Sequence, residues 1–254
     1  MRVKILGCGP SSGVPRIGND WGDCDPTNPK NRRTRLSILL ESGGQRLLID
    51  CGPDLRAQLL AAGIGEVDGA IVTHDHADHC HGIDDLRQVA ANRGAPVPLY
   101  ARAQVLKRLD RHFSYVFEGV EFYSPTVSSI AITDKIEWGA CQLRFADQPH
   151  GKISSLGIRA DEGDRSLAYA VDFHDLTPEM EAMYSGVGTW IAACTPQQRH
   201  PTHANLDAVL GWAHELNVGQ LLLTHLDKSL DYATLASRLP DWAEPAYDGL
   251  ELVL

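Results

Sequence analysis

The chain has 254 residues, of which 43% are hydrophobic and 22% are charged, and its formal net charge at pH 7 is −10. This composition is that of a globular protein with a sizeable core, and the acidic excess argues against a protein that binds nucleic acid chiefly through a basic surface. The first apolar stretch is too short for a signal peptide, and no stretch approaches the roughly 18 apolar residues of a membrane helix. We therefore expect no membrane association.

The first half of the chain predicts hairpins followed by strand-helix-strand units. A strand at residues 1–7 precedes a long irregular segment at 10–34, which is rich in Gly, Pro, Asn and Asp. Two apolar runs at 36–42 and 45–52 flank a pair of glycines, which is a hairpin signal. The next predicted elements are a helix at 53–63, a strand at 69–74, a helix at 83–94, a strand at 97–101 and a helix at 103–113.

The second half repeats this order without repeating the sequence. The predicted elements are strands at 141–148, 155–160 and 166–172, a helix at 178–184, a strand at 189–194, a helix at 206–217, a strand at 220–225 and a helix at 231–239. Hairpins come first and strand-helix-strand units later in each half, which favours two packed sheets with helices outside. The predicted fold class is therefore α/β, an αββα four-layer sandwich. We see no repeat, linker or composition shift, and we predict a single domain over residues 1–254.

The six cysteines have no repeated spacing. Such scatter is typical of free thiols in a reducing compartment rather than of a disulfide framework. We therefore expect a cytoplasmic protein.

The segment "IVTHDHADHCHG" at residues 71–82 places four histidines and two aspartates behind a short apolar strand. His74 and His76 are two apart, so in extended backbone they point to the same side. Asp78 and His79 follow where the chain turns into a helix and can aim at a neighbouring point. This arrangement predicts two metal ions a few ångströms apart. Imidazole and carboxylate donors suit zinc or manganese, and iron also fits.

Further metal ligands are expected at other strand ends. His150, Asp172 and His225 each follow an apolar run. Each alone would be an ordinary loop residue. Together, at the carboxyl ends of successive strands, they would close one cleft.

With these residues the sequence resembles the metallo-β-lactamase fold superfamily: "LLIDCG" matches its early aspartate motif and "THDHADH" its histidine motif. The resemblance implies an αββα sandwich that binds two divalent metal ions, with Asp172 bridging them. Asp50 would orient the histidine segment, as carboxylates behind a metal site do. The implied ligands are His74, His76 and His150 for one metal and Asp78, His79 and His225 for the other.

Within the superfamily the chain resembles the phosphodiesterases encoded with the carbon-phosphorus lyase system, in "LGCGPSSGVP", "RRTRLS", "THANLDAVL" and "YDGLEL". Those relatives hold a structural zinc with a cysteine cluster and a histidine three residues beyond the last metal histidine. This chain keeps only Cys24 in that loop and has Lys228 at the later position. We therefore predict no separate structural zinc.

A bridging carboxylate holds two cations close, so that a bridging water loses a proton near neutral pH and attacks as hydroxide. The leading hypothesis is a phosphodiesterase for a small, cyclic or open phosphate ester. The predicted catalytic residues are Asp78, through the second metal, and His203, as the acid that protonates the leaving group. For the acid, a pKa near the operating pH is expected; the alternative for His203 is packing at a helix entry.

Other residues carry weaker signals. The run Lys30, Arg32, Arg33 and Arg35 could receive a phosphate or fasten the long loop. His81 is interpreted as a solvent or supporting residue of the motif, and His200 as a surface neighbour of His203. Cys80 and Cys194 are interpreted as small buried thiols.

Three other functions stay open. A transfer-RNA 3′-processing ribonuclease would share the metal motif, although the net charge argues against it. A glyoxalase II-type thioesterase is disfavoured because no added helical domain follows the core. A metal-binding sensor or scaffold without catalysis would be supported by lost ligands, and every expected ligand is present. The family resemblance also suggests a homodimer.

Overall fold

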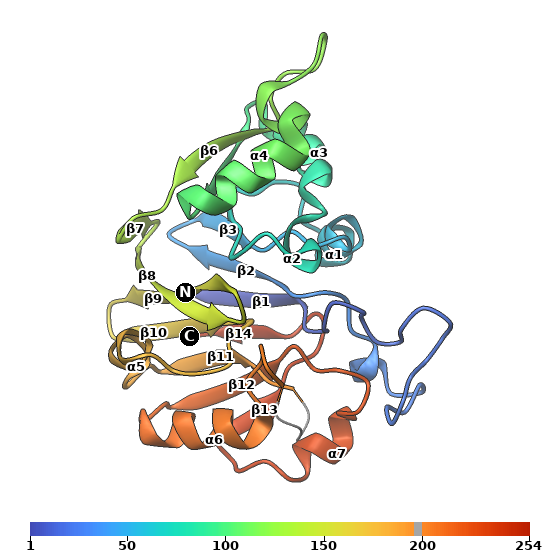
Figure 1. Cartoon of the computed structure of the whole chain (residues 1–254), viewed down its shortest axis with the longest axis vertical. Helices are drawn as coiled ribbons and strands as arrows, with labels where there is room; N and C mark the ends of the chain where they lie inside the picture. Colours follow the sequence, from blue (N-terminus) through green and yellow to red (C-terminus); the bar gives the residue numbers. More distant parts are fainter. Residues whose placement is uncertain (196–199) are drawn as a thin grey trace.

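The computed structural model describes residues 1–195 and 200–254, which form two mixed β-sheets packed face to face between helices (Figure 1). This arrangement confirms the predicted αββα sandwich. In these described ranges the first sheet has seven strands in the order β14-β1-β2-β3-β4-β5-β6. The strands are β1 (Arg2–Gly7), β2 (Ser37–Ser42), β3 (Gln45–Ile49), β4 (Gly69–Ile71), β5 (Val97–Ala101), β6 (Val127–Ala131) and β14 (Glu251–Val253).

The second sheet has the same construction. Among the described residues it also has seven strands, in the order β13-β12-β11-β10-β9-β8-β7. In each sheet an antiparallel group adjoins a parallel one: β3 to β6 run parallel in the first sheet and β10 to β13 in the second. The strands are β7 (Lys135–Trp138), β8 (Cys141–His150), β9 (Ile153–Glu162), β10 (Arg165–Ala170), β11 (Thr189–Ala193), β12 (Gln220–Thr224) and β13 (Ala243–Pro245).

Helices cover the outer face of each sheet (Figure 1). Those from the first half of the chain pack on the first sheet, and those from the second half pack on the second. The α-helices are α1 (Leu55–Ala62), α2 (Ala77–Cys80), α3 (Leu86–Arg93), α4 (Ala103–Glu118), α5 (Pro178–Tyr184), α6 (Leu206–Glu215) and α7 (Tyr232–Ala236), and short 3-10 helices span Pro29–Asn31 and Ile83–Asp85.

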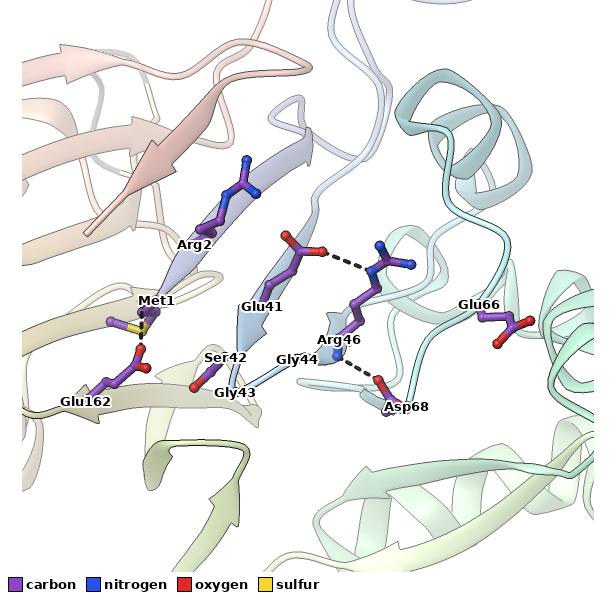
Figure 2. A pocket seen from close by; sticks show the side chains of 10 residues that line it. All are labelled: Met1, Arg2, Glu41, Ser42, Gly43, Gly44, Arg46, Glu66, Asp68 and Glu162. Carbon is purple, nitrogen blue, oxygen red and sulfur yellow. Dashed lines mark hydrogen bonds and ion pairs between the residues drawn. The ribbon is translucent and has the colours of Figure 1, made fainter.

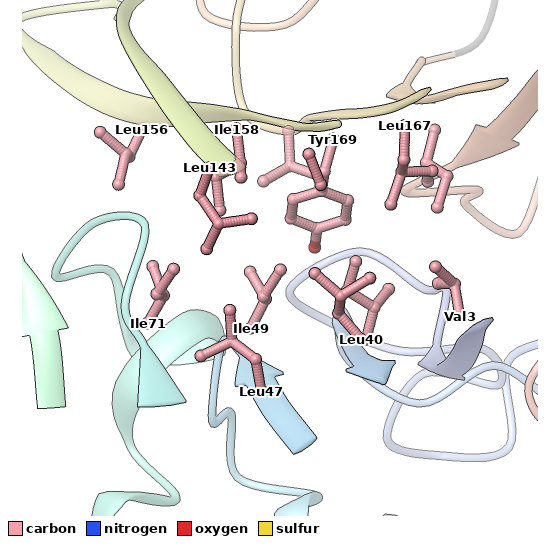
Figure 3. Packing of buried hydrophobic residues seen from close by; sticks show 14 of the residues in the cluster. Val3, Leu40, Leu47, Ile49, Ile71, Leu143, Leu156, Ile158, Leu167 and Tyr169 are labelled. Carbon is pink, nitrogen blue, oxygen red and sulfur yellow. The ribbon is translucent and has the colours of Figure 1, made fainter. Parts of the chain in front are cut away.

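The central core lies between the two sheets (Figure 3). Strand β2 shows how the sequence produces the layers, because successive residues of a strand face opposite sides. Ile38 and Leu40 belong to the cluster between the sheets, whereas Leu39 belongs to the cluster under the helices. Burial of each such side chain contributes about 1.5–3 kcal/mol. Both faces of the sheets are thus apolar, and polar chemistry is left to the strand ends.

The strand ends gather the predicted metal ligands at one edge of the sandwich. β3 ends just before Asp50, and the parallel strand β4 ends just before the histidine segment. In the other sheet β8 ends at His150, β10 just before Asp172 and β12 just before His225. Because β8, β10 and β12 all run the same way, their carboxyl ends meet at the same edge.

The structure differs from the predicted elements where strands are short or exposed. Strands β6, β7, β13 and β14 were not predicted, because β6 and β14 show mostly exposed residues, half of the residues of β7 are exposed and β13 is only three residues long. The predicted helix at 83–94 begins as a 3-10 turn, and the last predicted helix, at 231–239, forms only over Tyr232–Ala236. Helix α4 continues past the predicted end through an irregular Phe113 to Glu118.

The long segment at 10–34 protrudes beside the sandwich (Figure 1) and is anchored to α7 through Asp231. Its carboxylate accepts hydrogen bonds from Asn31 Nδ2 at 2.6 Å and from Thr234 N at 2.9 Å, the second of which caps α7. Burial alone would raise the pKa of Asp231, but the bonds to Thr234, Asn31 and Asp25 outweigh it and lower the pKa from 3.8 to about 2.

We expect Asp231→Ala to lower the free energy of unfolding by about 1–2 kcal/mol at neutral pH, because a helix cap and a loop anchor are lost together. The folded-state pKa lies below the unfolded one, so this contribution is fully present above about pH 4 and is lost as the pH falls toward 2. Denaturant titrations of both proteins at neutral pH and near pH 3 measure the difference. A gap that stays constant over this range would contradict the assignment.

No helix in residues 1–195 and 200–254 has the length and apolar character needed to cross a membrane. All six cysteines are free and buried.

Candidate metal centre

Asp172 lies at the centre of the predicted ligands. Its Oδ2 atom is 3.5 Å from His74 Nε2, 3.6 Å from His79 Nε2 and 3.4 Å from His150 Nε2. Its other oxygen, Oδ1, is 3.5 Å from His225 Nε2. One carboxylate therefore faces imidazoles from both sheets.

The two remaining predicted ligands lie at the rim of this cluster. His76 Nδ1 is 3.2 Å from His150 Nε2, and Asp78 Oδ2 is 3.5 Å from His79 Nε2. All seven residues predicted to bind metal are therefore brought together. In the described chain, two groups of residues have donor atoms that all lie within 4.8 Å of one another, and both groups contain Asp172. The first group is His74, His76, His150 and Asp172, and the second is Asp172, His203 and His225.

His203 was predicted as an acid, not as a ligand. Its Nδ1 atom is 3.9 Å from Asp172 Oδ1, and its ring stacks on that of His225 with centroids 4.7 Å apart. No spacing rule links residue 203 to the histidine segment, so the position of His203 beside the donor cluster is seen only from its distance to Asp172 in the structure.

The donor set fits a cation. His74 Nε2, His79 Nε2 and Asp172 Oδ1 are buried and lack a hydrogen-bond partner in the described ranges. Buried polar groups without partners are costly, and native proteins hold few of them. Imidazole nitrogens and carboxylate oxygens converging on one point are what a divalent metal ion requires. The cluster is therefore suited to divalent metal binding.

Three residues of the site have left-handed backbone: Asp50 with φ 63°, Asp172 with φ 52° and His225 with φ 60°. This conformation is uncommon outside glycine, although Asp, Asn and His adopt it more readily than others. Asp50 and His225 directly follow β3 and β12, and Asp172 lies two residues after the end of β10, so the backbone turns sharply and aims each side chain into the site. Strained backbone of this kind clusters at functional sites.

Asp50 and Thr73 hold the rings of two donors. The fully buried Asp50 carboxylate accepts from His79 Nδ1 at 2.7 Å, from Thr73 N at 2.8 Å and from the Thr73 hydroxyl at 3.0 Å. The same hydroxyl lies 3.1 Å from His74 Nδ1, which can donate to it. With both Nδ1 atoms engaged, the Nε2 atoms of His74 and His79 are left facing Asp172. The predicted orienting role of Asp50 agrees with this geometry, whereas Thr73 was overlooked because a threonine carries no ligand signal.

We expect Thr73→Val to weaken metal binding by about tenfold to a hundredfold, the usual effect of losing a group that orients a ligand. Valine has the shape of threonine but cannot accept from His74 or donate to Asp50. Competition with a chromogenic chelator measures the affinity, and Thr73→Ser, which keeps the hydroxyl, is the matched control. Wild-type affinity in the valine variant would exclude this role.

The charges in the cluster are strongly coupled. Burial alone would lower the pKa of His79, but the Asp50 and Asp172 carboxylates outweigh it and hold that pKa well above its usual value. Burial would raise the pKa of Asp172, but His79 and His225 hold it well below. Burial, followed by the charge of His79, lowers the pKa of His74 to about 4. A metal ion would displace the proton from His79, since only the neutral ring binds metal.

The predicted near-neutral pKa of His203 is wrong. Burial, followed by the charge of His225, lowers the pKa of His203 to about 3, and the Asp172 carboxylate opposes this only partly. The ring is therefore neutral at pH 7 until an anion arrives beside it, because a nearby negative charge favours the protonated form.

The basic run at 30–35 turns out to fasten the long loop. Arg33, only 1% exposed, donates to the carbonyl oxygens of Leu226, Asp227 and Leu230 at 2.7–3.3 Å and to Asn31 Oδ1 at 3.1 Å. The alternative that Arg33 contacts substrate is therefore wrong.

The other basic side chains of this run also have partners within the protein. Lys30 lies over the rings of Tyr232 and Tyr247, 4.3 Å from each centroid. Arg35 pairs with Asp54 at 3.1 Å, and Arg32 stacks on the ring of Trp21. The basic run therefore holds the loop in place rather than binding a phosphate.

The residues with weaker signals keep minor roles. His81 ends helix α2 and contacts the ring of Phe113, and the exposed His200 contacts Thr202. Cys80 and Cys194 are buried, and burial raises the pKa of each thiol to about 12. Both cysteines are thus protonated small side chains, as interpreted from the sequence.

A cavity of about 340 Å³ opens over the donor cluster, which provides its polar floor. Its lining residues are Ser11, His76, Asp78, His150, Gly151, Lys152, Ile153, Asp172, Thr202, His203 and His225. A larger hollow of about 550 Å³ lies far from it, by the start of β1 (Figure 2). Its charges are largely paired, Met1 with Glu162 and Glu41 with Arg46, and it holds no comparable donor set.

Comparison with known proteins agrees with this fold. A family model described as a beta-lactamase superfamily domain matches residues 45–226. The chain therefore belongs to the beta-lactamase superfamily, and its donor cluster makes it a metal-dependent hydrolase of that class.

A crystal structure described as a new diphosphatase from the PhnP family places the chain more narrowly. It is 32% identical to this chain, with a TM-score of 0.90, and the match covers 99% of this chain and 97% of that one. The protein is accordingly PhnP-like, which confirms the resemblance seen in the sequence.

Two curated relatives carry other names. A ribonuclease Z from Mycobacterium sp. (strain KMS) is 25% identical over 227 residues, covering 78% of this chain and 79% of that protein. An octanoyltransferase from Porphyromonas gingivalis (strain ATCC BAA-308 / W83) is 30% identical over 263 residues and matches 100% of this chain. The chain spans 52% of that relative, about half its length, so the name octanoyltransferase describes a much longer protein.

Proposed function

We propose that the protein is a phosphodiesterase that uses two divalent metal ions, zinc or manganese with iron as a further option, to hydrolyse a small phosphate ester. The observation that carries the proposal is the position of Asp172, which is only 2% exposed and whose two oxygens face separate groups of imidazole rings. These rings have buried nitrogen atoms without a hydrogen-bond partner among the described residues. We assign His74, His76 and His150 to one ion, Asp78, His79 and His225 to the other, and Asp172 to both.

When bound by these residues, two such cations would supply a water of lowered pKa as the nucleophile and would neutralise charge on the phosphate oxygens. The protein's own part is to orient and to move a proton. Asp50 and Thr73 fix the rings of His79 and His74. His203 lies in the cavity wall next to Asp172, where it can protonate the leaving alkoxide once the substrate phosphate has raised its pKa.

Similarity to the PhnP-family diphosphatase supports a phosphate substrate. A cavity of about 340 Å³ and a net charge of −10 support a small one. Similarity to ribonuclease Z favours transfer-RNA 3′ processing as the second candidate. A glyoxalase II-type thioesterase is the third outcome that an assay should include.

The decisive experiment begins with metal-free protein reloaded with zinc or manganese. Bound metal is counted while bis-p-nitrophenyl phosphate, a 2′,3′-cyclic nucleotide, a transfer-RNA precursor and a thioester are assayed in parallel. We expect about two metals per chain and turnover of the small diesters. His76→Ala and Asp172→Ala should each remove the metal binding and the turnover. His214→Ala, at an exposed position of α6, should change neither property.

Cleavage of the precursor RNA alone would favour the ribonuclease, and turnover of the thioester alone would favour the thioesterase. Metal binding without any turnover would favour a sensor. Absence of metal binding would sink the proposal.

We further propose that the long loop needs no structural zinc. Cys24 Sγ lies 3.9 Å from the Arg33 guanidinium, and Lys228 pairs with Asp20, so protein groups already link the loop to the segment after β12. Six free cysteines support a cytoplasmic location.

A further inference from the structure

The three histidines assigned to the first metal ion are held in different ways. His74 Nδ1 lies 3.1 Å from the Thr73 hydroxyl, and His150 Nδ1 lies 2.9 Å from Thr202 O. His76 instead turns its Nδ1 atom toward the cluster, 3.2 Å from His150 Nε2. Its Nε2 atom has no hydrogen-bond partner within residues 1–195 and 200–254, and the residue is exposed. The position of His76 therefore depends on the backbone that carries it.

Asp75, between the two donor histidines, holds this backbone from the other side. Successive residues of an extended chain face opposite sides, so Asp75 points away from the cluster that His74 and His76 face. Its Oδ2 atom lies 2.6 Å from Arg108 Nε on α4, and the two side chains are 17% and 40% exposed. In the described part of the chain no other carboxylate lies within 4.0 Å of Arg108. The ion pair thus ties the donor segment to α4.

Helix α4 is a firm anchor for this ion pair. Val105 and Leu109, on either side of Arg108 along the helix, are each 1% exposed and belong to the core under the helices of the first sheet. Exposing such side chains to water is unfavourable, so the helix is held in place. Further along α4, the ring of Phe113 contacts that of His81, with centroids 5.4 Å apart. Helix α4 therefore contacts the chain both before and after the donors at 76–79.

We propose that Arg108 is a positioning residue of the metal centre. Through Asp75 it fixes the backbone of His76 and so sets the affinity for the first metal ion. Arg108 does not line the cavity over the donors, so it acts without touching the substrate. The inference rests on the proposed function and extends its metal centre to a helix on the outer face of the sheet.

The charge of Arg108 and its positioning role predict opposite effects of its removal. A cation near a metal site repels the metal ions, so charge alone predicts tighter metal binding when Arg108 is neutralised. Release of Asp75 would instead let His76 move, and loss of a group that orients a ligand weakens metal binding by about tenfold to a hundredfold. The sign of the change therefore separates the two.

The first test is zinc affinity, measured by competition with a chromogenic chelator. Arg108→Met keeps most of the side-chain stem but not the charge, and we expect it to weaken binding by about tenfold or more. Arg108→Lys keeps the cation and should recover part of this loss. The absorption spectrum of cobalt(II)-loaded protein, which depends on ligand number and geometry, should change in Arg108→Met and return toward wild type in Arg108→Lys. Arg111→Met, at an exposed position of the same helix, is the control.

A double-mutant cycle tests whether Arg108 acts through Asp75. Asp75→Asn alone should also weaken zinc binding, and adding Arg108→Met to it should cause little further loss, because both changes break the same contact. Thermal unfolding of the metal-free protein should change little, since an ion pair this exposed contributes little to stability. A large loss of stability in Arg108→Met would make Arg108 a purely structural residue and overturn the inference.

These measurements need no turnover, so they separate this inference from the proposed function. Wild-type protein that binds zinc but hydrolyses no ester would remove the proposed function and leave the positioning role to be decided by zinc affinity. Active wild-type protein together with unchanged or tighter zinc binding in Arg108→Met would remove the positioning role alone.

Discussion

Replacing Asp172 by asparagine should lower phosphodiester turnover on the order of a thousandfold or more and reduce the bound metal. Asparagine keeps the size and the left-handed backbone tolerance of aspartate, so the change isolates the charge. The carboxylate lies within 3.6 Å of donor nitrogens from both sheets. The substitution would remove the anion that we assign to both metal ions, and several kcal/mol of transition-state stabilisation correspond to this factor.

Metal content by elemental analysis and turnover of bis-p-nitrophenyl phosphate are measured on the same preparation. Asp164→Asn, in the exposed turn between β9 and β10, is the matched control and should behave as wild type. Two bound metals together with turnover within a few-fold of wild type would contradict the bridging assignment.

Replacing His203 by alanine should have an effect that depends on the leaving group. An alkoxide needs a proton to leave, so turnover of a cyclic nucleotide should fall by about a hundredfold or more. Nitrophenolate leaves without a proton, and turnover of bis-p-nitrophenyl phosphate should fall less than about tenfold. With a pKa of about 3, His203 is neutral at pH 7, so as an acid it would have to take up its proton together with the substrate anion. Nuclear magnetic resonance titration should accordingly show the His203 pKa rising when a phosphate ester binds.

His200→Ala is the control, since its ring lies 5.0 Å from that of His203 but outside the cavity lining. Equal losses on both substrates, accompanied by loss of metal, would make His203 a ligand rather than an acid.

The fold and the metal donors were largely predictable because both depend on local patterns. Apolar runs marked the buried strands, and a polar donor directly after each run marked His150, Asp172 and His225. Strand β6 was not predicted because four of its five residues are exposed and only Val127 contributes to the core. The sequence contains no pattern for such a strand.

Other features depend on distances that no spacing encodes. Arg33 was interpreted within a basic surface run, yet carbonyl groups almost two hundred residues away surround its guanidinium. Thr73 acts through its contacts with Asp50 and His74. The low pKa of His203 arises from burial among other histidines, which only the assembled site produces.

The left-handed backbone at Asp50, Asp172 and His225 limits how this centre can change during evolution. Glutamate has the same charge as aspartate but is a poorer fit to that conformation, and β-branched residues fit it worse still. Each position therefore has two requirements, the function of its side chain and the conformation of its backbone. Exchange of Asp172 or His225 for another kind of ligand would also have to reshape a strand end, so tuning through residues around the ligands is the more accessible route to a changed metal preference.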